Sequence, residues 1–341
     1  MTHQNLSTIF RRFSERECRG SSLLYEMLSL GVSEDEALLS LAAFGEGRGQ
    51  PIPNLLLGAV HYLLLKGKEH RLADYYPSIT EQPKDPLNAF SNFKDFCQTY
   101  KQEILHILQT KRVQTNEVRR CGYLYPAFSY IYDQVKKPLA LIEIGTSAGF
   151  QLLWDQYQYS YGSNETYGNR DSEVFIESEC RTENQPSLLT KSPPVSHRIA
   201  LDLNIVDLTF DEAYVWLNAL IWPEHKERRL LFKQAAKAVQ EHQLDVREGN
   251  GIAMLLDIVK EIPSDSTICV FHTHVANQFS TDMKYELEGV ISQIGKERKI
   301  FHLYNNMWDS ELHLDCILGD KSYERTIGKT DGHGRWFEWH L

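Results

Sequence analysis

Features that mark membrane, secreted and zinc-ribbon proteins are missing from the sequence. No stretch reaches the roughly 18 to 20 uninterrupted apolar residues that cross a bilayer, and the N-terminal MTHQNLSTIFRRF lacks the apolar core of a signal peptide. The six cysteines include no C-x-x-C pair, which disfavours a zinc ribbon or a disulfide framework. We therefore expect a cytoplasmic chain with reduced thiols and without a membrane partner.

An excess of positive charge is missing as well. The chain has 36 Lys and Arg against 46 Asp and Glu, a formal net charge of −10, whereas proteins that bind bulk nucleic acid usually present a basic face. Its 341 residues, 42% apolar and 24% charged, are typical of a soluble globular protein larger than one average domain. We expect a small-molecule substrate, and the sequence specifies neither that substrate nor an oligomeric state.

The pattern of apolar residues changes along the chain. Residues 5 to 135 repeat apolar side chains at three- and four-residue spacings, which indicates helices. From Leu139 onwards short β-rich runs alternate with helical segments, which is typical of βαβ units and a mainly parallel sheet. We predict a helical domain over 1–135 and a doubly wound, Rossmann-like α/β domain over 136–341. The tyrosine-rich stretch at about 157–197 is predicted to insert a β-hairpin before the second strand.

The stretch PLALIEIGTSAGFQLLWD, residues 138–155, carries the sharpest functional signal. An apolar run ends in Glu143 and passes directly into a turn that contains Gly145, Ser147 and Gly149, and an amphipathic segment follows. Glycine lets the backbone approach a ligand, and the N-terminus of a helix offers free N–H groups. The pattern therefore predicts a strand, a tight turn and a helix that hold a nucleotide-type ligand.

The spacing of these residues, acidic-x-G-x-small-x-G, resembles the first motif of class I S-adenosylmethionine-dependent methyltransferases. The resemblance implies that the loop passes beneath the cofactor and that Glu143 lies near its amino-acid end. Ser147 stands where such motifs usually carry a glycine. The dinucleotide fingerprint G-x-G-x-x-G fits this spacing poorly. S-adenosylmethionine is the expected cofactor, and a turn without a ligand is the alternative.

Polar residues near the next two predicted strands extend the resemblance. Asp202, which ends the strand RIALD, resembles the acid that accepts bonds from the two ribose hydroxyls in these enzymes, and a carboxylate suits a vicinal diol because it has two acceptor oxygens. Glu177, at the end of VFIE, is the alternative. Asn250 follows the third predicted strand, where methyltransferases commonly place a polar group against the adenine, although a helix N-cap role is equally consistent.

The fourth predicted strand, within VFHTHVANQF, supplies our candidate catalytic residues. His272 and His274 are two residues apart, so on a strand they would share a face, and Asn277 follows near the carboxyl end, where open α/β sheets place ligand-binding groups. One of them could orient the substrate or act as a general base near neutral pH. A satisfied structural pair and a metal-binding pair are alternatives, but no spacing indicates a third metal ligand, and we assign no metal.

Several blocks along the whole chain resemble a bacterial family of unknown function. This resemblance implies a methyltransferase-like fold preceded by a helical region, and it implies no particular reaction. We therefore expect a methyltransferase that binds S-adenosylmethionine and acts on a small or medium acceptor. A dinucleotide-dependent oxidoreductase, a metal-dependent hydrolase centred on His272 and His274, and a fold-retaining binding or scaffold protein stay open as alternatives. The blocks are GRGQPIPNLLLGAVHYLLLKG, RVQTNEVRR, LIEIGTSAGFQLLWDQYQYSYG, LDLNIVDL, LNALIWPEHKERR, VFHTHVA and GHGRWFEW.

Overall fold

The computed structural model describes residues 3–47, 49–114 and 116–341 and divides the chain into two compact units. The first, the helical unit, comprises Met1–Thr115 and Thr209–Leu230. The second, the sheet unit, comprises Asn116–Leu208 and Leu231–Leu341. The division therefore lies earlier than the predicted boundary after residue 135, and the helical unit also takes in a segment from the middle of the chain.

Apolar helix–helix packing builds the helical unit. Its central helix α4 (Ile52–Leu65) is buried on nearly all sides, as its almost unbroken apolar sequence predicts. His61 in this helix is a packed core residue, because Nδ1 lies 2.8 Å from the carbonyl oxygen of Ala219 and Nε2 lies 2.8 Å from Oγ of Ser78. The other α-helices of this unit are α1 (His3–Phe13), α2 (Leu23–Ser33), α3 (Glu36–Ala42), α5 (Phe90–Thr99), α6 (Lys101–Thr110) and α8 (Asp211–Ala219).

The segment 209–230 belongs to the helical unit because its side chains complete that unit's contacts. Trp216 donates its indole N–H to the carbonyl oxygen of Arg112 at 2.7 Å. The carboxylate of Glu224 accepts bonds from the hydroxyl of Ser22 and from the backbone N–H of Leu24, at the first turn of α2. A helix N-terminus has free N–H groups, so this carboxylate stabilises α2 from a distant part of the sequence.

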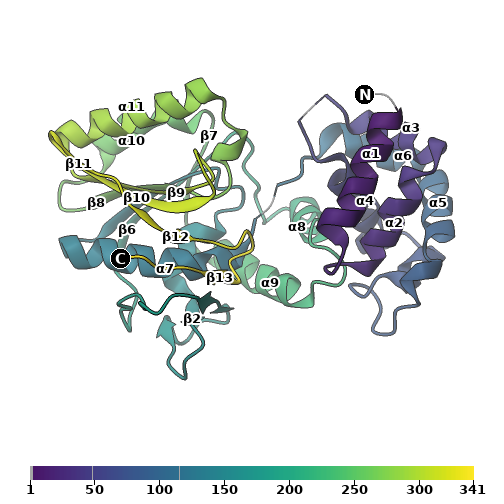
Figure 1. Cartoon of the computed structure of the whole chain (residues 1–341), viewed down its shortest axis with the longest axis horizontal. Helices are drawn as coiled ribbons and strands as arrows, with labels where there is room; N and C mark the ends of the chain where they lie inside the picture. The colour runs from purple at the N-terminus through teal and green to yellow at the C-terminus, as the bar shows by residue number, and fades with distance from the viewer. Residues whose placement is uncertain (1–2, 48, 115) are drawn as a thin grey trace. The chain divides into compact units, whose positions relative to one another are not determined.

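A mostly parallel sheet forms the core of the sheet unit (Figure 1). The strand order is β11-β10-β9-β8-β1-β6-β7, and β12 also pairs with β10. Strands β7, β6, β1, β8 and β9 run parallel, while β10 is antiparallel to β9 and to the short strands β11 and β12. The bounds are β1 Leu139–Ile144, β6 Val195–Asp202, β7 Asp245–Glu248, β8 Thr267–His272, β9 Ile300–Asn305, β10 Glu311–Leu318, β11 Lys321–Tyr323 and β12 Thr326–Lys329.

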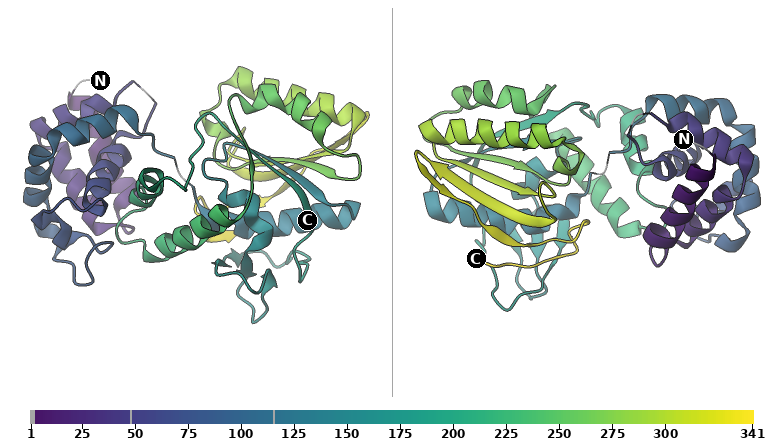
Figure 2. Two further views of the ribbon diagram at one scale, coloured as in Figure 1. Left: turned by 180° about the vertical axis from the view of Figure 1, so that it is seen from behind. Right: turned by 45° about the horizontal axis from the view of Figure 1, so that its top comes forward.

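Helices cover both faces of this sheet, so its central strands are buried on both sides. Helices α10 (Gly251–Glu261) and α11 (Thr281–Glu297) lie on one face, and α7 (Cys121–Val135) lies on the other (Figures 1 and 2). Every residue of β1, β8 and β9 is buried, which explains why these strands appear in the sequence as nearly continuous apolar runs. The predicted α/β architecture with a mainly parallel sheet is therefore confirmed.

The predicted insertion folds into more than one hairpin. Strands β2 (Gln158–Ser160) and β3 (Tyr167–Gly168) pair antiparallel, but β4 (Phe175–Glu177) joins β2 in parallel to give a three-stranded sheet. The next strand, β5 (Glu179–Cys180), pairs with the C-terminal β13 (Trp336–Phe337). The alternating tyrosines of this stretch are anchors, because Tyr157 is fully buried and donates its hydroxyl to the carbonyl oxygen of Phe150 at 2.8 Å.

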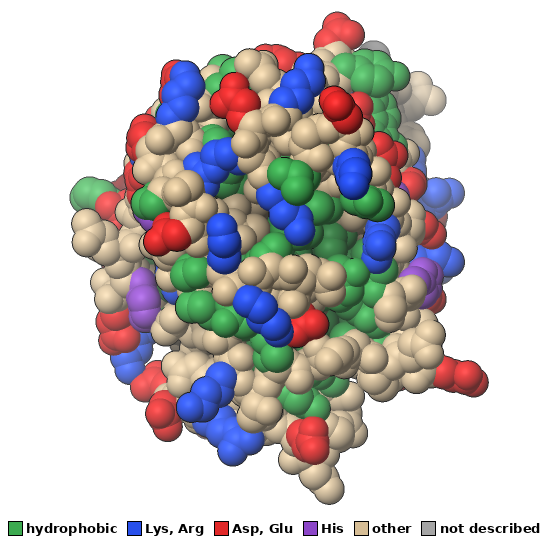
Figure 3. Space-filling model, turned by 90° about the vertical axis from the view of Figure 1, so that its left-hand side faces the viewer, with side chains coloured by type: hydrophobic (Ala, Val, Ile, Leu, Met, Phe, Trp, Pro, Cys, Tyr) green, Lys and Arg blue, Asp and Glu red, His purple; other side chains and the backbone are tan. Residues whose placement is uncertain are grey.

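The surface and the helix lengths agree with the charge and hydropathy of the sequence. Among the described residues, no helix is both long and apolar enough to cross a membrane. On the face drawn in Figure 3, lysine and arginine side chains lie among acidic ones and apolar patches, so that face has no extended basic surface.

We predict that Arg298 is essential for the stability of the sheet unit. It follows α11, and its guanidinium donates hydrogen bonds to the carbonyl oxygens of Val259, Ile262, Pro263 and Ser266, where α10 ends and β8 approaches. The last carbonyls of a helix have no partners within that helix. Arg298→Met keeps the apolar stem but removes every donor, and should lower the free energy of unfolding by at least about 2 kcal/mol.

The neighbouring Lys299 provides a matched control. Its ammonium lies 5.1 Å from the ring centroid of Phe301. Lys299→Met should change the free energy of unfolding by less than about 0.5 kcal/mol, as is usual for surface substitutions. Denaturant unfolding of both variants measures the difference, and equal effects of the two substitutions would contradict the prediction.

Candidate functional site

The strand order reverses direction between β1 and β8. From β1 the chain continues to β6 and β7 on one side, and then returns to build β8 and β9 on the other side. In open α/β sheets, ligands bind beyond the carboxyl ends of the strands at such a reversal. The loops after β1 and β8 are in close contact here, because a Cβ added to Gly145 would lie 2.6 Å from Cγ2 of Val275.

The turn after β1 is tight and partly left-handed. Gly145, Ser147 and Gly149 all have positive φ, at 78°, 53° and 81°. The two glycines are required by protein packing, because a Cβ at Gly149 would lie 2.4 Å from Cδ1 of Leu244, just as one at Gly145 would strike Val275. The segment that follows is the short 3-10 helix η6 (Phe150–Gln156), so the predicted α-helix after the turn is wrong and the turn is not followed by an α-helical N-terminus.

Asp202 is joined directly to this turn. It ends β6, next to β1, and its Oδ2 accepts the backbone N–H of Ser147 at 2.8 Å while Oδ1 accepts that of Asn204 at 2.9 Å. Burial raises the pKa of Asp202, and these backbone bonds oppose the rise. A carboxylate has about four acceptor sites, so two bonds leave capacity for a ligand hydroxyl. The alternative, Glu177, lies in β4 of the small sheet and is exposed.

Glu143 is a buried carboxyl group beside the turn. Its side chain is among the buried polar groups, and its Oε2 accepts the hydroxyl of Thr146 at 2.6 Å. Burial raises the pKa of Glu143 to about 8; the charge of Asp202 adds to the rise, whereas the bond from Thr146 and the charge of Arg120 oppose it. The group therefore keeps its proton near neutral pH unless a positive charge arrives nearby.

Ser147 carries an unpartnered polar atom. The residue is 7% exposed, and its Oγ is buried without a hydrogen-bond partner among the described residues. The backbone is fixed on both sides, since Ser147 donates to Asp202 and accepts the N–H of Val206 at 3.0 Å. A buried hydroxyl without a partner is less favourable than a hydrated one, so this oxygen is an open position for a hydrogen bond from outside the chain.

A buried arginine connects the strand reversal to the C-terminal loop. Arg120 is 5% exposed; its Nε donates to the carbonyl oxygen of Gly332 at 3.0 Å, and its Nη1 makes a long contact of 3.5 Å with Oγ1 of Thr273. Thr273 in turn donates to Oε1 of Gln151 at 2.9 Å. These three side chains were not predicted from the sequence. The only signal was the polar block RVQTNEVRR, and the partners of Arg120 lie far away in the chain.

The two candidate catalytic histidines lie in different environments. Strand β8 ends at His272, which is fully buried with Nε2 3.1 Å from Nε2 of His302, and its ring packs against that of Tyr304. His274 lies beyond the strand with φ 55°. Its N–H donates to Oδ1 of Asn305 at 3.0 Å. The prediction that His272 and His274 share one face of a strand is therefore wrong, because the strand ends between them; the catalytic role of either histidine stays a prediction.

The charge states of these histidines also follow from burial. Burial lowers the pKa of His272 to about 3. Burial likewise lowers the pKa of His274 to about 3; the positive charge of Arg120 acts in the same direction, and the charge of Asp331 opposes it. Both rings are therefore neutral at physiological pH. Among the described residues, no group of three or more His, Cys, Asp or Glu side chains is placed to hold a metal ion, so the metal-binding pair gains no geometric support.

The remaining predicted site residues, Asn250 and Asn277, are exposed. Asn250 is exposed and caps α10, because its Oδ1 accepts the backbone N–H of Ile252 at 3.1 Å. This is the helix-cap alternative, and the adenine role stays a prediction. Asn277 lies in the short 3-10 helix η7 (Ala276–Gln278), after β8, and is exposed.

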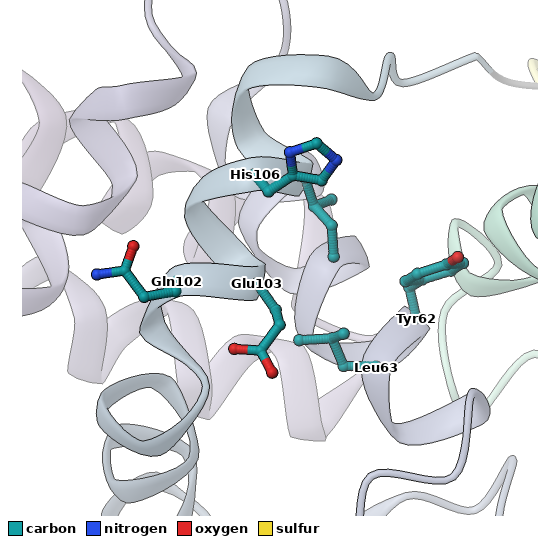
Figure 4. A pocket seen from close by; sticks show the side chains of 6 residues that line it. Tyr62, Leu63, Gln102, Glu103 and His106 are labelled. Carbon is teal, nitrogen blue, oxygen red and sulfur yellow. The ribbon is translucent and has the colours of Figure 1, made fainter.

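The helical unit has an apolar hollow of its own, apart from the residues at the strand reversal. It has a volume of about 370 Å³ and lies between α4 and α6 (Figure 4). Its acidic side chain, Glu103, is 3.1 Å from Nζ of Lys68. The surface of the hollow is almost entirely apolar and no convergent set of polar groups lines it, so we do not treat it as a catalytic centre. It is lined by Tyr62, Leu63, Gln102, Glu103, His106 and Ile107.

Comparison with known proteins identifies a family. The model of the family described as "Uncharacterized protein conserved in bacteria (DUF2332)" matches residues 7–339. No curated protein and no solved structure matches the chain.

The raised pKa of Glu143 predicts a measurable dependence of stability on pH. Between about 4.5, its unperturbed pKa, and about 8, the folded chain holds a proton that the unfolded chain has released. This contribution to the free energy of unfolding is present at low pH and is lost as pH rises through that window. Glu143→Gln has no such proton, so the stability of the variant relative to the parent chain should increase steadily with pH.

Denaturant unfolding at a series of pH values tests this. Glu177→Gln, at an exposed carboxyl of β4, is the matched control and should leave the pH profile of the parent chain unchanged. Parallel profiles for the parent chain and Glu143→Gln would show that Glu143 is ionised alike in the folded and unfolded states, contrary to the prediction.

Proposed function

The chain belongs to this uncharacterised bacterial family, and we propose that it binds S-adenosylmethionine at the carboxyl edge of β1 and β6 and methylates a small or medium acceptor. The proposal combines the sheet arrangement with the chemistry of three side chains at that edge: Glu143, Ser147 and Asp202. In this proposal the methyltransferase-like motif binds a ligand; the alternative is a turn that is retained with the fold and binds none.

The observation that carries the proposal is the strand order. Numbered from one to five in chain order, the parallel strands are β1, β6, β7, β8 and β9. Across the sheet they lie in the order β7-β6-β1-β8-β9, that is, three, two, one, four, five. This order matches that of doubly wound sheets, in which the ligand occupies the reversal, and it supports the Rossmann-like assignment. The glycine turn follows the first strand, and the carboxylate of Asp202 ends the second, so both lie where a ligand of this kind is expected.

The side chains fit the parts of the proposed cofactor. Ser147 Oγ lacks a partner among the described residues and could bond the amino-acid end. Glu143 is buried, and a cationic ligand would favour its carboxylate form. Asp202 has acceptor capacity for ribose hydroxyls beyond its two backbone bonds. When bound, the cofactor would supply an activated methyl group, and the protein's task would be to align the acceptor and exclude water.

Two features limit what the turn after β1 and the helix η6 can contribute to ligand binding through their backbone. Gly145 and Gly149 are in close contact with Val275 and Leu244, so their lack of a side chain serves packing as well as any ligand. The 3-10 helix η6 is too short to supply a helix dipole to an anion. The binding site we propose therefore depends on side chains more than on a phosphate-type loop, which agrees with a cofactor that carries no phosphate.

We predict selective stabilisation by adenosyl compounds. Thermal unfolding is measured in parallel with S-adenosylmethionine, S-adenosylhomocysteine, NAD and zinc. A ligand at about 100 times its dissociation constant should stabilise the folded chain by roughly 2.7 kcal/mol. A shift with the adenosyl compounds alone supports the proposal. Stabilisation by NAD or zinc alone would favour the dinucleotide or the metal alternative, and the absence of any shift with either adenosyl compound would exclude the proposed cofactor.

The Ser147 hydroxyl allows binding and stability to be separated. Ser147→Ala keeps the Cβ and the backbone bonds but removes the unpartnered oxygen, so the free energy of unfolding should stay the same or rise slightly. Affinity for S-adenosylhomocysteine should fall by about tenfold, as expected for one hydrogen bond of about 1.4 kcal/mol. Titration calorimetry measures the affinity. Glu177→Gln serves as the control that should bind normally, and an unchanged affinity of Ser147→Ala would place the ligand elsewhere.

A further inference from the structure

We propose that His333, oriented by the buried carboxylate of Glu117, is the base that removes a proton from the acceptor, and that the acceptor is therefore a hydroxyl or N–H compound. This inference rests on the proposed methyl transfer for its chemical meaning. The geometry that carries it lies in the C-terminal loop and at the N-cap of η5 (Val118–Arg120), where Glu117 belongs to the polar block RVQTNEVRR.

The pair has the arrangement of a base and its orienting group. Nδ1 of His333 lies 3.3 Å from Oε2 of Glu117, and the histidine side chain is 42% exposed while that of Glu117 is 3% exposed. Nδ1 itself is buried and makes no aligned hydrogen bond within the described part of the chain. The exposed side of the ring is therefore the side that carries Nε2. Contacts between catalytic groups are often long without ligand and tighten when substrate binds.

The loop that carries His333 is held rigidly. The carboxylate of Asp331 accepts the backbone N–H groups of His333 and Arg335, each at 3.1 Å, and also pairs with the guanidinium of Arg335. Gly334 has φ 71°, and a Cβ there would lie 2.4 Å from the carbonyl oxygen of Arg119, so this loop is packed directly on η5. A rigid loop and a buried carboxylate together fix the orientation of the imidazole ring.

The pair adjoins the proposed cofactor site. Arg120 bonds the carbonyl oxygen of Gly332 and contacts Thr273, which follows β8 at the strand reversal. A Cβ on Gly332 would lie 3.7 Å from Cε1 of His274. The charged and titratable groups around His333 are thus Glu117, Asp331, Arg335, Arg120 and His274. Of the histidines near the reversal, His333 combines exposure with a buried carboxylate partner.

The chemistry that follows is a single proton transfer. The acceptor's O–H or N–H proton would pass to Nε2 of His333, and the electron pair left on that oxygen or nitrogen would form the new bond to the methyl carbon. The bond between that carbon and the cofactor's sulfur would break, and its electron pair would leave with the sulfur as S-adenosylhomocysteine. The ring becomes an imidazolium whose Nδ1–H faces the Glu117 carboxylate, which stabilises the charge. The imidazolium then returns its proton to solvent. An acceptor that is already anionic, such as a carboxylate, needs no such base.

A second histidine in the same chain is a matched control. Nε2 of His340 lies 3.4 Å from Oε2 of Glu338, and its side chain is 43% exposed. Distance and exposure thus match those of His333, but the Glu338 side chain is 29% exposed, so its carboxylate is solvated and orients the ring weakly. The two pairs differ in the burial of the carboxylate and in the ring nitrogen that faces it, which is Nδ1 in His333 and Nε2 in His340. A difference in reactivity between the two histidines therefore reports both features together, and variants of Glu117 isolate the effect of its buried carboxylate.

The test measures the acylation rate of each histidine in the full chain with diethyl pyrocarbonate, read by peptide mass spectrometry at about pH 8, where ordinary imidazoles are neutral. We expect His333 to react about tenfold faster than His340, because its Nε2 is held as the free acceptor atom. Glu117→Gln should abolish this advantage, and Glu117→Asp should restore part of it. Glu338→Gln should leave His340 unchanged. The amide of Glu117→Gln retains an acceptor for the Arg119 N–H, and circular dichroism verifies the fold.

A second arm repeats the labelling with saturating S-adenosylhomocysteine. If thermal unfolding shows binding, protection of His333 but not of His340 supports the inference, and equal labelling with and without the ligand overturns the placement of His333 beside the cofactor. If no adenosyl compound binds, the proposed methyl transfer fails on its own. Equal rates for His333 and His340, or no effect of Glu117→Gln, overturn the oriented base in either case.

Discussion

The hydrogen bond from the backbone N–H of Ser147 to the carboxylate of Asp202 is the contact on which the site depends. It joins the turn after β1 to the end of the neighbouring strand β6, and it holds a non-glycine residue in the left-handed region. It acts together with the backbone bonds from Gly145 and Thr146 to the carbonyl oxygen of Leu201, which also tie the turn to the end of β6. One carboxylate thus organises the turn and also remains available to a ligand.

The central sheet could be predicted from sequence because each of its buried strands is recognisable as a short apolar run. The apolar runs of β1, β8 and β9 are a direct consequence of burial on both faces, and β6 has a shorter buried run, Ile199 to Leu201. Asp202 could be placed for the same reason, since it ends such a run. The ribose, adenine and amino-acid roles assigned to the site residues stay predictions, because they concern a ligand and not the chain.

The errors have a common physical origin in long-range contacts. The spacing of His272 and His274 gave no sign that β8 ends between them, because His274 is held in its turn by the side chain of Asn305 on another strand. The helix predicted after Gly149 became a 3-10 segment in a tightly packed region, where Phe150 meets Phe232 at 5.7 Å between ring centroids. The role of Arg120 and the pairing of Glu117 with His333 were not predicted, because Gly332 and His333 lie at the other end of the chain.

The helical unit is built from two separate segments, and this has a consequence for biosynthesis. A ribosome delivers residues 1–115 long before 209–230, yet His61 needs the carbonyl oxygen of Ala219, and the first turn of α2 needs Glu224. Until those residues emerge from the exit tunnel, the nascent helices expose apolar surface, and His61 lacks the carbonyl partner that it has in the folded chain. The N-terminal segment must therefore wait in an incomplete state, and chaperones that bind exposed apolar helices would meet this protein early in its synthesis.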